Sequence, residues 1–142
     1  MDGYADDPTI RDDAVLWRRI PPWHLIFDAN LRRWRPKSAA FEDHPNGTPM
    51  SVYLADMMEA TGRGPDDALT GHQAFALAGI SAGLARSTGQ QVAREPLPGE
   101  PAHAVVVGRK TKSVSRRFAK ESHWVVSPLE PQVRSEARRT SQ

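Results

Sequence analysis

Arginines and tryptophans near the start of the chain are the residues best suited to bind a ligand. Within residues 16–38, six cationic side chains stand among three tryptophans. A guanidinium group makes paired hydrogen bonds to phosphates and carboxylates, and an indole ring stacks on planar groups. An anionic ligand with an aromatic part is therefore the expected partner. The competing interpretation is a half-exposed sheet in which the tryptophans are core and the arginines form salt bridges to Asp28, Glu42 or Asp43.

Strand periodicity predicts which of these side chains share a face. Alternate side chains of a strand point to opposite faces, so Trp17 and Arg19 share one face, and Arg33 and Arg35 share a face of a later strand. If the two segments pair, two cationic rows converge on one anion. The predicted ligand-binding residues of this segment are Arg18, Arg19, Arg33 and Arg35 for the anion, with Trp17 or Trp34 for stacking.

A second candidate anion site follows an apolar strand in the second half of the chain. Gly108 ends this strand and opens a basic helix, whose first backbone N–H groups and dipole attract anions. The spaced glycines of a Walker A loop or of a dinucleotide fingerprint are missing. The cations that would strengthen the field are Arg109, Lys110, Lys112, Arg116 and Arg117. An ordinary solvated helix face is the alternative.

Few residues suggest catalysis. The chain has five histidines, with no pair at the spacing of a helical metal site and no HExxH motif. His103 and His123 each begin a predicted strand, so neighbouring strands could bring them together as a proton-transfer pair or a weak metal site. Capping or edge hydrogen bonds are the ordinary alternative. The weak catalytic candidates are His103, Glu121 and Ser38. No metal site and no cofactor is predicted from these residues.

A scattered pattern of single residues loosely resembles that of ADP-ribosyltransferase-type toxin domains. The pattern consists of an early strand arginine, a serine followed by an aromatic residue, and a late glutamate, here Arg19, Ser38 with Phe41, and Glu95 or Glu121. The serine doublet and the paired acidic residues of the arginine-specific branch are absent. The resemblance implies an enzyme that uses NAD, with Arg19 on the pyrophosphate and Glu121 or His103 at the reacting centre.

Composition limits the class of protein. The chain has 142 residues, of which 39% are hydrophobic, enough for one domain with a buried core. It has no cysteine, which excludes disulfides, thiolate nucleophiles and cysteine-ligated zinc. No apolar run is long enough to cross a bilayer, and the first residues are acidic where a targeting peptide would be basic. We therefore expect a cytoplasmic protein with no membrane partner, and the frequent Ala, Gly, Pro and Arg suggest a GC-rich bacterial genome.

Charge is distributed unevenly along the chain. The net charge is +2, but residues 1–71 carry eight basic and twelve acidic side chains, and residues 72–142 carry eleven and five. Arginine outnumbers lysine by fifteen to four, part of which reflects codon composition. The acidic first half would repel a long polyanion unless the basic groups form one face.

The elements that must position these residues follow from periodicity and turn chemistry. Strands are predicted over residues 14–20, 90–94, 103–108 and 123–127, a hairpin over residues 23–35, a short strand running into a helix over residues 48–62, and a basic helix over residues 111–121. The clearest helix is predicted over residues 70–87, which are rich in alanine and apolar around most of the circumference. Gly79 and Gly83 would let another backbone approach this helix closely.

The predicted fold is a single compact α+β domain. Its mainly antiparallel sheet is built from the N-terminal hairpin and the two late strands, and it packs on a central buried helix. Residues 1–13 are predicted to be a disordered acidic segment, residues 14–127 the domain, and residues 128–142 a disordered tail. The leading functional hypothesis is non-catalytic recognition of an anionic partner, single-stranded nucleic acid or a nucleotide, by the Arg/Trp hairpin and the basic helix. The alternatives are a small NAD- or nucleotide-using transferase of ADP-ribosyltransferase type, and a protein-interaction subunit of a larger assembly.

Overall fold

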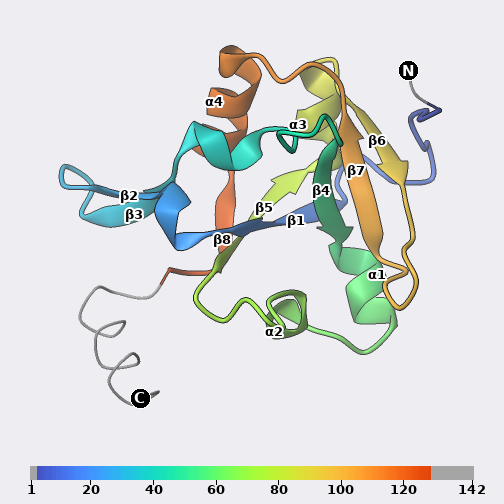
Figure 1. The fold of residues 1–142 in the computed structure, drawn as a ribbon, viewed down its shortest axis with the longest axis horizontal. Helices are drawn as coiled ribbons and strands as arrows, with labels where there is room; N and C mark the ends of the chain where they lie inside the picture. The colour runs from blue at the N-terminus through green and yellow to red at the C-terminus, as the bar shows by residue number, and fades with distance from the viewer. Residues whose placement is uncertain (1–2, 129–142) are drawn as a thin grey trace.

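A six-stranded antiparallel sheet forms the centre of the computed structural model, which describes residues 3–128 (Figure 1). The strand order is β6-β7-β4-β1-β5-β8. The strands are β1 (Val15–Ile20), β4 (Met50–Leu54), β5 (Ala76–Ser81), β6 (Gln91–Arg94), β7 (His103–Val107) and β8 (His123–Val126). The predicted α+β class with a mainly antiparallel sheet is confirmed, as are four of the predicted strands and the strand that runs into a helix.

Short elements surround this sheet. β2 (Leu25–Asp28) and β3 (Arg33–Pro36) form the predicted hairpin, but as a separate two-stranded sheet that protrudes on the left of Figure 1. Our expectation that the hairpin joins the main sheet is therefore wrong. The helical elements are the 3-10 turns η1 (Pro22–His24) and η2 (Ser38–Phe41), and the helices α1 (Ala55–Ala60), α2 (Pro65–Ala68), α3 (Ala82–Ser87) and α4 (Lys112–Glu121). Within residues 3–128, none of them has the length and apolar character needed to span a bilayer.

The main sheet packs against side chains on both faces. Because strand side chains alternate, Leu16 and Ile20 of β1 enter the larger core, to which η2, α3 and α4 contribute. Trp17 points to the other face, where Leu77 and residues of α1 and α2 form a smaller core. β1 thus lies between two apolar layers, and its two arginines also lie on opposite faces.

The helix predicted over residues 70–87 is wrong for most of its length. Residues 76–81 form β5, which pairs with β1 on one side and β8 on the other, and only residues 82–87 are helical. Alanine and leucine favour a helix in isolation. Between β1 and β8, however, the backbone of this segment is hydrogen-bonded on both sides, and its apolar side chains are buried on both faces of the sheet. Gly79 does permit a close approach, although to a side chain, because a Cβ there would lie 2.6 Å from the ring of His123.

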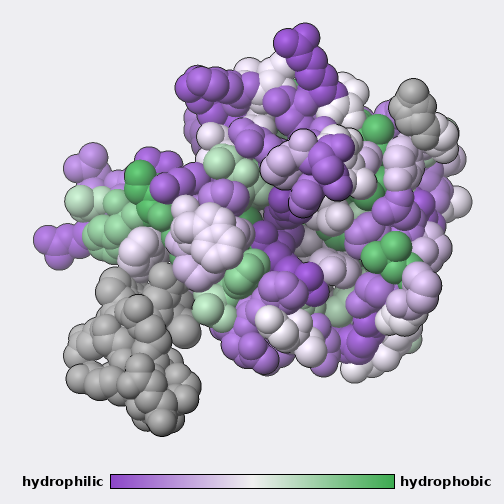
Figure 2. All heavy atoms as spheres, viewed as in Figure 1, coloured by the Kyte–Doolittle hydropathy of each residue, from purple (hydrophilic) through white to green (hydrophobic). Residues whose placement is uncertain are grey.

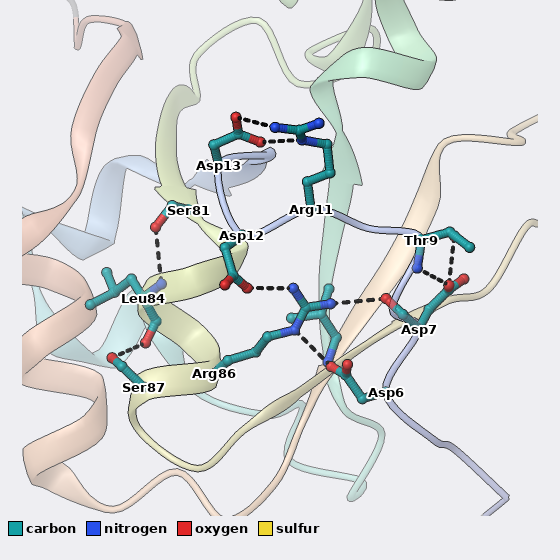
Figure 3. A network of polar contacts seen from close by, with 11 residues as sticks. Asp6, Asp7, Thr9, Arg11, Asp12, Asp13, Ser81, Leu84, Arg86 and Ser87 are labelled. Atoms are coloured by element: carbon teal, nitrogen blue, oxygen red, sulfur yellow. Dashed lines mark hydrogen bonds and ion pairs between the residues drawn. The ribbon is translucent and has the colours of Figure 1, made fainter.

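The acidic N-terminal residues are bound to the folded domain. Arg86 of α3 donates hydrogen bonds to the carboxylates of Asp6 and Asp12 and to the carbonyl oxygen of Asp7 (Figure 3). Main-chain and side-chain bonds to Val92 hold the same segment along the edge of β6. These contacts join residues 74 to 86 positions apart in the sequence, which local patterns cannot reveal.

These contacts correct one expectation about the chain ends. The disordered segment predicted for residues 1–13 is wrong for residues 3–13, because their aspartates find cationic partners on α3 and β6. The tail predicted for residues 128–142 lies, apart from Pro128, outside the described residues.

Acid is expected to weaken the attachment of the N-terminal segment. Although partial burial opposes ionisation, hydrogen bonds from the Val92 N–H and from Arg86 hold the pKa of Asp6 below its usual value of 3.8. A carboxyl group with a lowered pKa stabilises the fold above its unfolded-state pKa, and this contribution is lost as the pH falls through the lower folded-state value. The free energy of unfolding, measured by urea denaturation, should therefore fall more steeply between about pH 5 and about pH 3 in the wild type than in Asp6→Asn. Asp13→Asn is the control, and equal slopes for Asp6→Asn and the wild type would contradict the expectation.

Candidate nucleic-acid interface

A protruding arm, residues 22–37, carries most of the large hydrophobic side chains that are exposed. The arm consists of η1 and the β2–β3 hairpin. Of the five large hydrophobic side chains exposed within residues 3–128, four lie on it, namely Trp23 (66% exposed), Ile26 (37%), Phe27 (46%) and Leu31 (57%). Apolar side chains gathered in one exposed place mark a contact surface.

The hairpin register sorts these side chains between two faces of the arm. Phe27 lies opposite Trp34, and their rings meet edge to face with centroids 5.3 Å apart. On the other face Ile26 lies opposite Arg35, and Asp28 lies opposite Arg33. The predicted shared face of Arg33 and Arg35 is confirmed. The exposed cations of the arm are Arg32, Arg33, Arg35 and Lys37.

The arm is anchored at its base. The backbone N–H of Lys37 donates to the carbonyl oxygen of His24 at 2.7 Å, which closes the hairpin. The indole N–H of Trp124 in β8 donates to the carbonyl oxygen of Trp34 at 3.1 Å. The arm is thereby held to the main sheet at its base, while its outer end extends from the body at the left of Figure 2, with hydrophobic and hydrophilic residues side by side.

Helix α4 lies at the top of Figure 1, above η2. It packs on η2, which directly follows the arm. The rings of Phe118 and Phe41 meet edge to face with centroids 6.2 Å apart, and Ser115 Oγ donates to the carbonyl oxygen of Phe41 at 2.8 Å. The exposed cations of α4 are Lys112, Arg116, Arg117 and Lys120. These four and the four exposed cations of the arm are the side chains that we call the basic surface.

The predicted binding residues of β1 serve the interior instead. Arg19 donates from Nε to the carbonyl oxygen of Ala68 at 2.6 Å, and its guanidinium lies 4.8 Å from the centre of the Tyr53 ring. Trp17 is 4% exposed and belongs to the smaller core, so it offers no face for stacking. The two cationic rows do not converge, because β1 belongs to the main sheet and the hairpin does not.

Lys110, predicted as an anion contact, is also turned inward. Its ammonium group donates to Asp43 Oδ1 at 2.8 Å and to the carbonyl oxygens of Val106 and Gly108, and the side chain is 3% exposed. At the start of α4, Thr111 Oγ1 accepts the N–H of Val114, which occupies a donor that an anion would use. The predicted anion site at this turn is therefore wrong for Lys110, whereas Arg109 is exposed.

The weak catalytic candidates are not brought together. His103 and His123 begin β7 and β8, which β4, β1 and β5 separate in the sheet. His103 is buried, with Nδ1 at 2.8 Å from the carbonyl oxygen of Glu95 and Nε2 at 3.1 Å from Ser51 Oγ. Both ring nitrogens thus have structural partners within the sheet.

The residues of the ADP-ribosyltransferase-like pattern are spread over both faces of the sheet. Arg19 lies on the face covered by α2, whereas Ser38 and Glu121 belong to η2 and α4 on the other face. Glu121 pairs with Arg117 at 2.7 Å, and Glu95 accepts a hydrogen bond from Tyr4. The chain matches no protein-family model, and no curated protein or solved structure matches it. Function is therefore argued from the residues themselves.

A cleft of about 400 Å³ opens where β1 and β4 separate. The two strands pair at Leu16–Leu54 and Trp17–Tyr53, and the side chain of Arg18 enters the gap beyond. Its guanidinium donates to the carbonyl oxygens of Ala40, Ser51 and Glu42. Figure 2 shows a hollow with hydrophilic walls near the centre of the view, where β1 and β4 lie in Figure 1.

The cleft contains the positive charge of Arg18. Burial lowers the pKa of Arg18 to about 10, which still leaves the guanidinium charged at neutral pH. Desolvation, with the nearby charges of Arg18 and Lys37, lowers the pKa of His24, which also lines the cleft. Of these residues only Arg18 was predicted as a ligand contact, because the strand separation that gathers them has no local sequence signal. Across the described ranges no group of three His, Asp or Glu side chains is placed to hold a metal ion.

Proposed function

We propose that the protein binds single-stranded nucleic acid, without catalysis, through the basic surface of the arm and α4. The observation that carries this proposal is that one arm exposes both aromatic side chains and cations: Trp23 and Phe27 are exposed, and so are Arg33, Arg35 and Lys37. Aromatic side chains stack on unpaired bases, each worth about 1–3 kcal/mol, while arginines and lysines neutralise the phosphates. Trp23 replaces the buried Trp17 of the sequence-based hypothesis as the stacking residue.

The acidic first half of the chain is compatible with this proposal. The N-terminal aspartates Asp6, Asp7, Asp12 and Asp13 all pair with arginines, which reduces the repulsion of a polyanion. In Figure 1 the N-terminus lies on the right and the arm on the left, so acidic and basic groups occupy different ends of the molecule.

The test is fluorescence-anisotropy binding of a labelled single-stranded oligonucleotide at about 50 and about 200 mM salt. We expect affinity to fall by about tenfold or more over this range, since each released counterion contributes. The variant Arg33→Ala/Arg35→Ala should lose most of the binding. Trp23→Ala and Phe27→Ala should each weaken it about five- to tenfold through lost stacking. Absence of binding at the lower salt concentration would refute the proposal.

Two control variants test whether the loss of oligonucleotide binding is specific to the basic surface. Arg11→Ala removes an arginine whose side chain is 80% exposed and lies on the N-terminal segment, and Leu97→Ala removes an exposed apolar side chain outside the arm. Both should bind like the wild type. A protein partner would use the same apolar side chains of the arm, but its binding would depend little on salt. If the arm binds a protein with an affinity that does not depend on salt, protein binding replaces nucleic-acid binding as the proposed function.

A further inference from the structure

Arg18 is a half-buried cation that forms no ion pair with a carboxylate of residues 3–128. A guanidinium has five N–H donors, and the carbonyl oxygens of Ala40, Ser51 and Glu42 accept three, the last at 3.5 Å. Two donors therefore remain on a side chain that lines the cleft. The nearby carboxylate of Asp43 is already bound to Lys110 at 2.8 Å. A charge that is partly withdrawn from water is stabilised by a counter-charge, so Arg18 would stabilise an anion in the cleft.

His24 supplies a second and independent anchor in the same cleft. Its Nδ1 atom is buried and has no hydrogen-bond partner within the described part of the chain. Buried polar atoms in native proteins are nearly always hydrogen-bonded, and an exception points to a missing partner. Arg18 and His24 come from β1 and from η1, and both line the cleft. Two residues with unused hydrogen-bonding capacity thus line one cleft.

We infer that this cleft is a binding site for a phosphate monoester, held by Arg18 and His24. A carboxylate has two oxygens, which one guanidinium fork occupies fully. A phosphate monoester has three terminal oxygens, so the third can bond with Nδ1 of His24 while two remain on Arg18. The volume of about 400 Å³ falls in the range of small-molecule sites and admits a nucleoside monophosphate.

The carboxylates of the cleft determine how strongly an anionic ligand is repelled. Glu42 also lines it, and its charge acts on His24 by raising the pKa of the imidazole, against the larger effect of burial. Lys110 compensates Asp43, as described above. The uncompensated carboxylate of Glu42 is therefore expected to weaken the binding of an anion, and removing its charge should strengthen that binding.

The ligand has two possible sources with the same chemistry, a free mononucleotide or the phosphorylated end of a nucleic-acid strand. The cleft opens at the root of the arm, because His24 directly precedes β2, and Ala39, another lining residue, follows β3. A strand bound along the arm could place its terminal phosphate there. The phosphate site itself does not depend on the proposed nucleic-acid binding.

The first test is an amide NMR titration of the full chain with AMP, with adenosine as the matched ligand that lacks the phosphate. AMP should shift the signals of residues 39–51, and adenosine should not. Arg18→Gln should weaken AMP binding by at least about tenfold through the lost charged contacts, and His24→Leu should also weaken it. Glu42→Gln should tighten it about twofold, and Arg11→Gln should leave it unchanged.

Equal shifts with AMP and adenosine, or no shift in residues 39–51 at saturating AMP, would overturn the inference. If Arg18→Gln fails to fold, His24→Leu and Glu42→Gln still test the site, because unchanged AMP affinity in both variants would refute it.

A comparison of terminally phosphorylated and unphosphorylated oligonucleotides distinguishes the two sources of the ligand. A preference for the phosphorylated strand that His24→Leu abolishes assigns the site to strand ends, and AMP binding without that preference assigns it to free mononucleotides. If the wild-type protein binds oligonucleotides but not AMP, the cleft site is refuted and the proposed nucleic-acid binding is not.

Discussion

Replacing Phe118 by alanine is expected to lower the free energy of unfolding by about 4 kcal/mol. The Phe118 ring is 0% exposed and packs edge to face on Phe41, which is also 0% exposed. Deleting it removes apolar contacts and leaves a cavity between α4 and η2. These two elements carry and support the basic surface, so the loss should be accompanied by weaker oligonucleotide binding. Urea denaturation measures the first effect, and anisotropy in the folded range measures the second.

Phe27→Ala is the matched control for the change in stability, because it makes the same chemical change on the exposed arm. Its expected cost is about 1 kcal/mol, mainly from the lost edge-to-face contact with Trp34. The double variant Phe41→Ala/Phe118→Ala should cost less than the sum of the single variants, because the two rings share one contact. A cost below about 1 kcal/mol for Phe118→Ala would mean that α4 does not pack on η2 as described.

Replacing Lys110 by methionine is expected to cost about 2–3 kcal/mol of stability. The ammonium group binds Asp43 and two backbone carbonyl oxygens, and methionine can fill its volume but make none of these bonds. Asp43, which also accepts the N–H of Met50, would be left without its counter-charge. Because the Asp43 side chain is 34% exposed, water offsets part of the loss, and the cost falls below that of a fully buried pair.

Lys112→Met tests whether burial is the cause, since Lys112 is exposed at the start of α4 and its replacement should change stability by less than about 0.5 kcal/mol. Adding Asp43→Asn to Lys110→Met should recover about 1 kcal/mol, because the unpaired charge is removed while an amide oxygen still accepts from Met50. Urea denaturation measures all four proteins. Equal stability of Lys110→Met and the wild type would show that Lys110 is not buried in its ion pair.

Several parts of the fold could be predicted because their signals are local. The turn between β2 and β3 depends on Asp28, whose carboxylate accepts the N–H groups of Asn30 and Leu31. The continuous apolar run of β7 is typical of a strand buried on both faces, and its residues from His103 to Val106 are buried. Helix α4 begins at a threonine cap and has an apolar side. Each of these signals lies within about ten residues.

The same reasoning failed where local preference and tertiary context disagree. The alanine-rich residues 76–81 favour a helix in isolation, yet they form β5 because β1 and β8 supply hydrogen bonds on both sides. The strand β1 was predicted correctly, but the role of Trp17 and Arg19 as ligand contacts was not. These two side chains pack against α1 and α2, which lie later in the chain.

Local signals therefore predicted the Arg-rich hairpin, the buried strand β7 and the basic helix α4. The protrusion of the hairpin, the exposure of Trp23 and Phe27, the burial of Lys110 and the shared cleft of Arg18 and His24 emerge only in the folded chain. The difference lies in the range of the interactions. Capping, turns and periodicity act between near neighbours, whereas burial and charge compensation depend on residues that only the folded chain brings together.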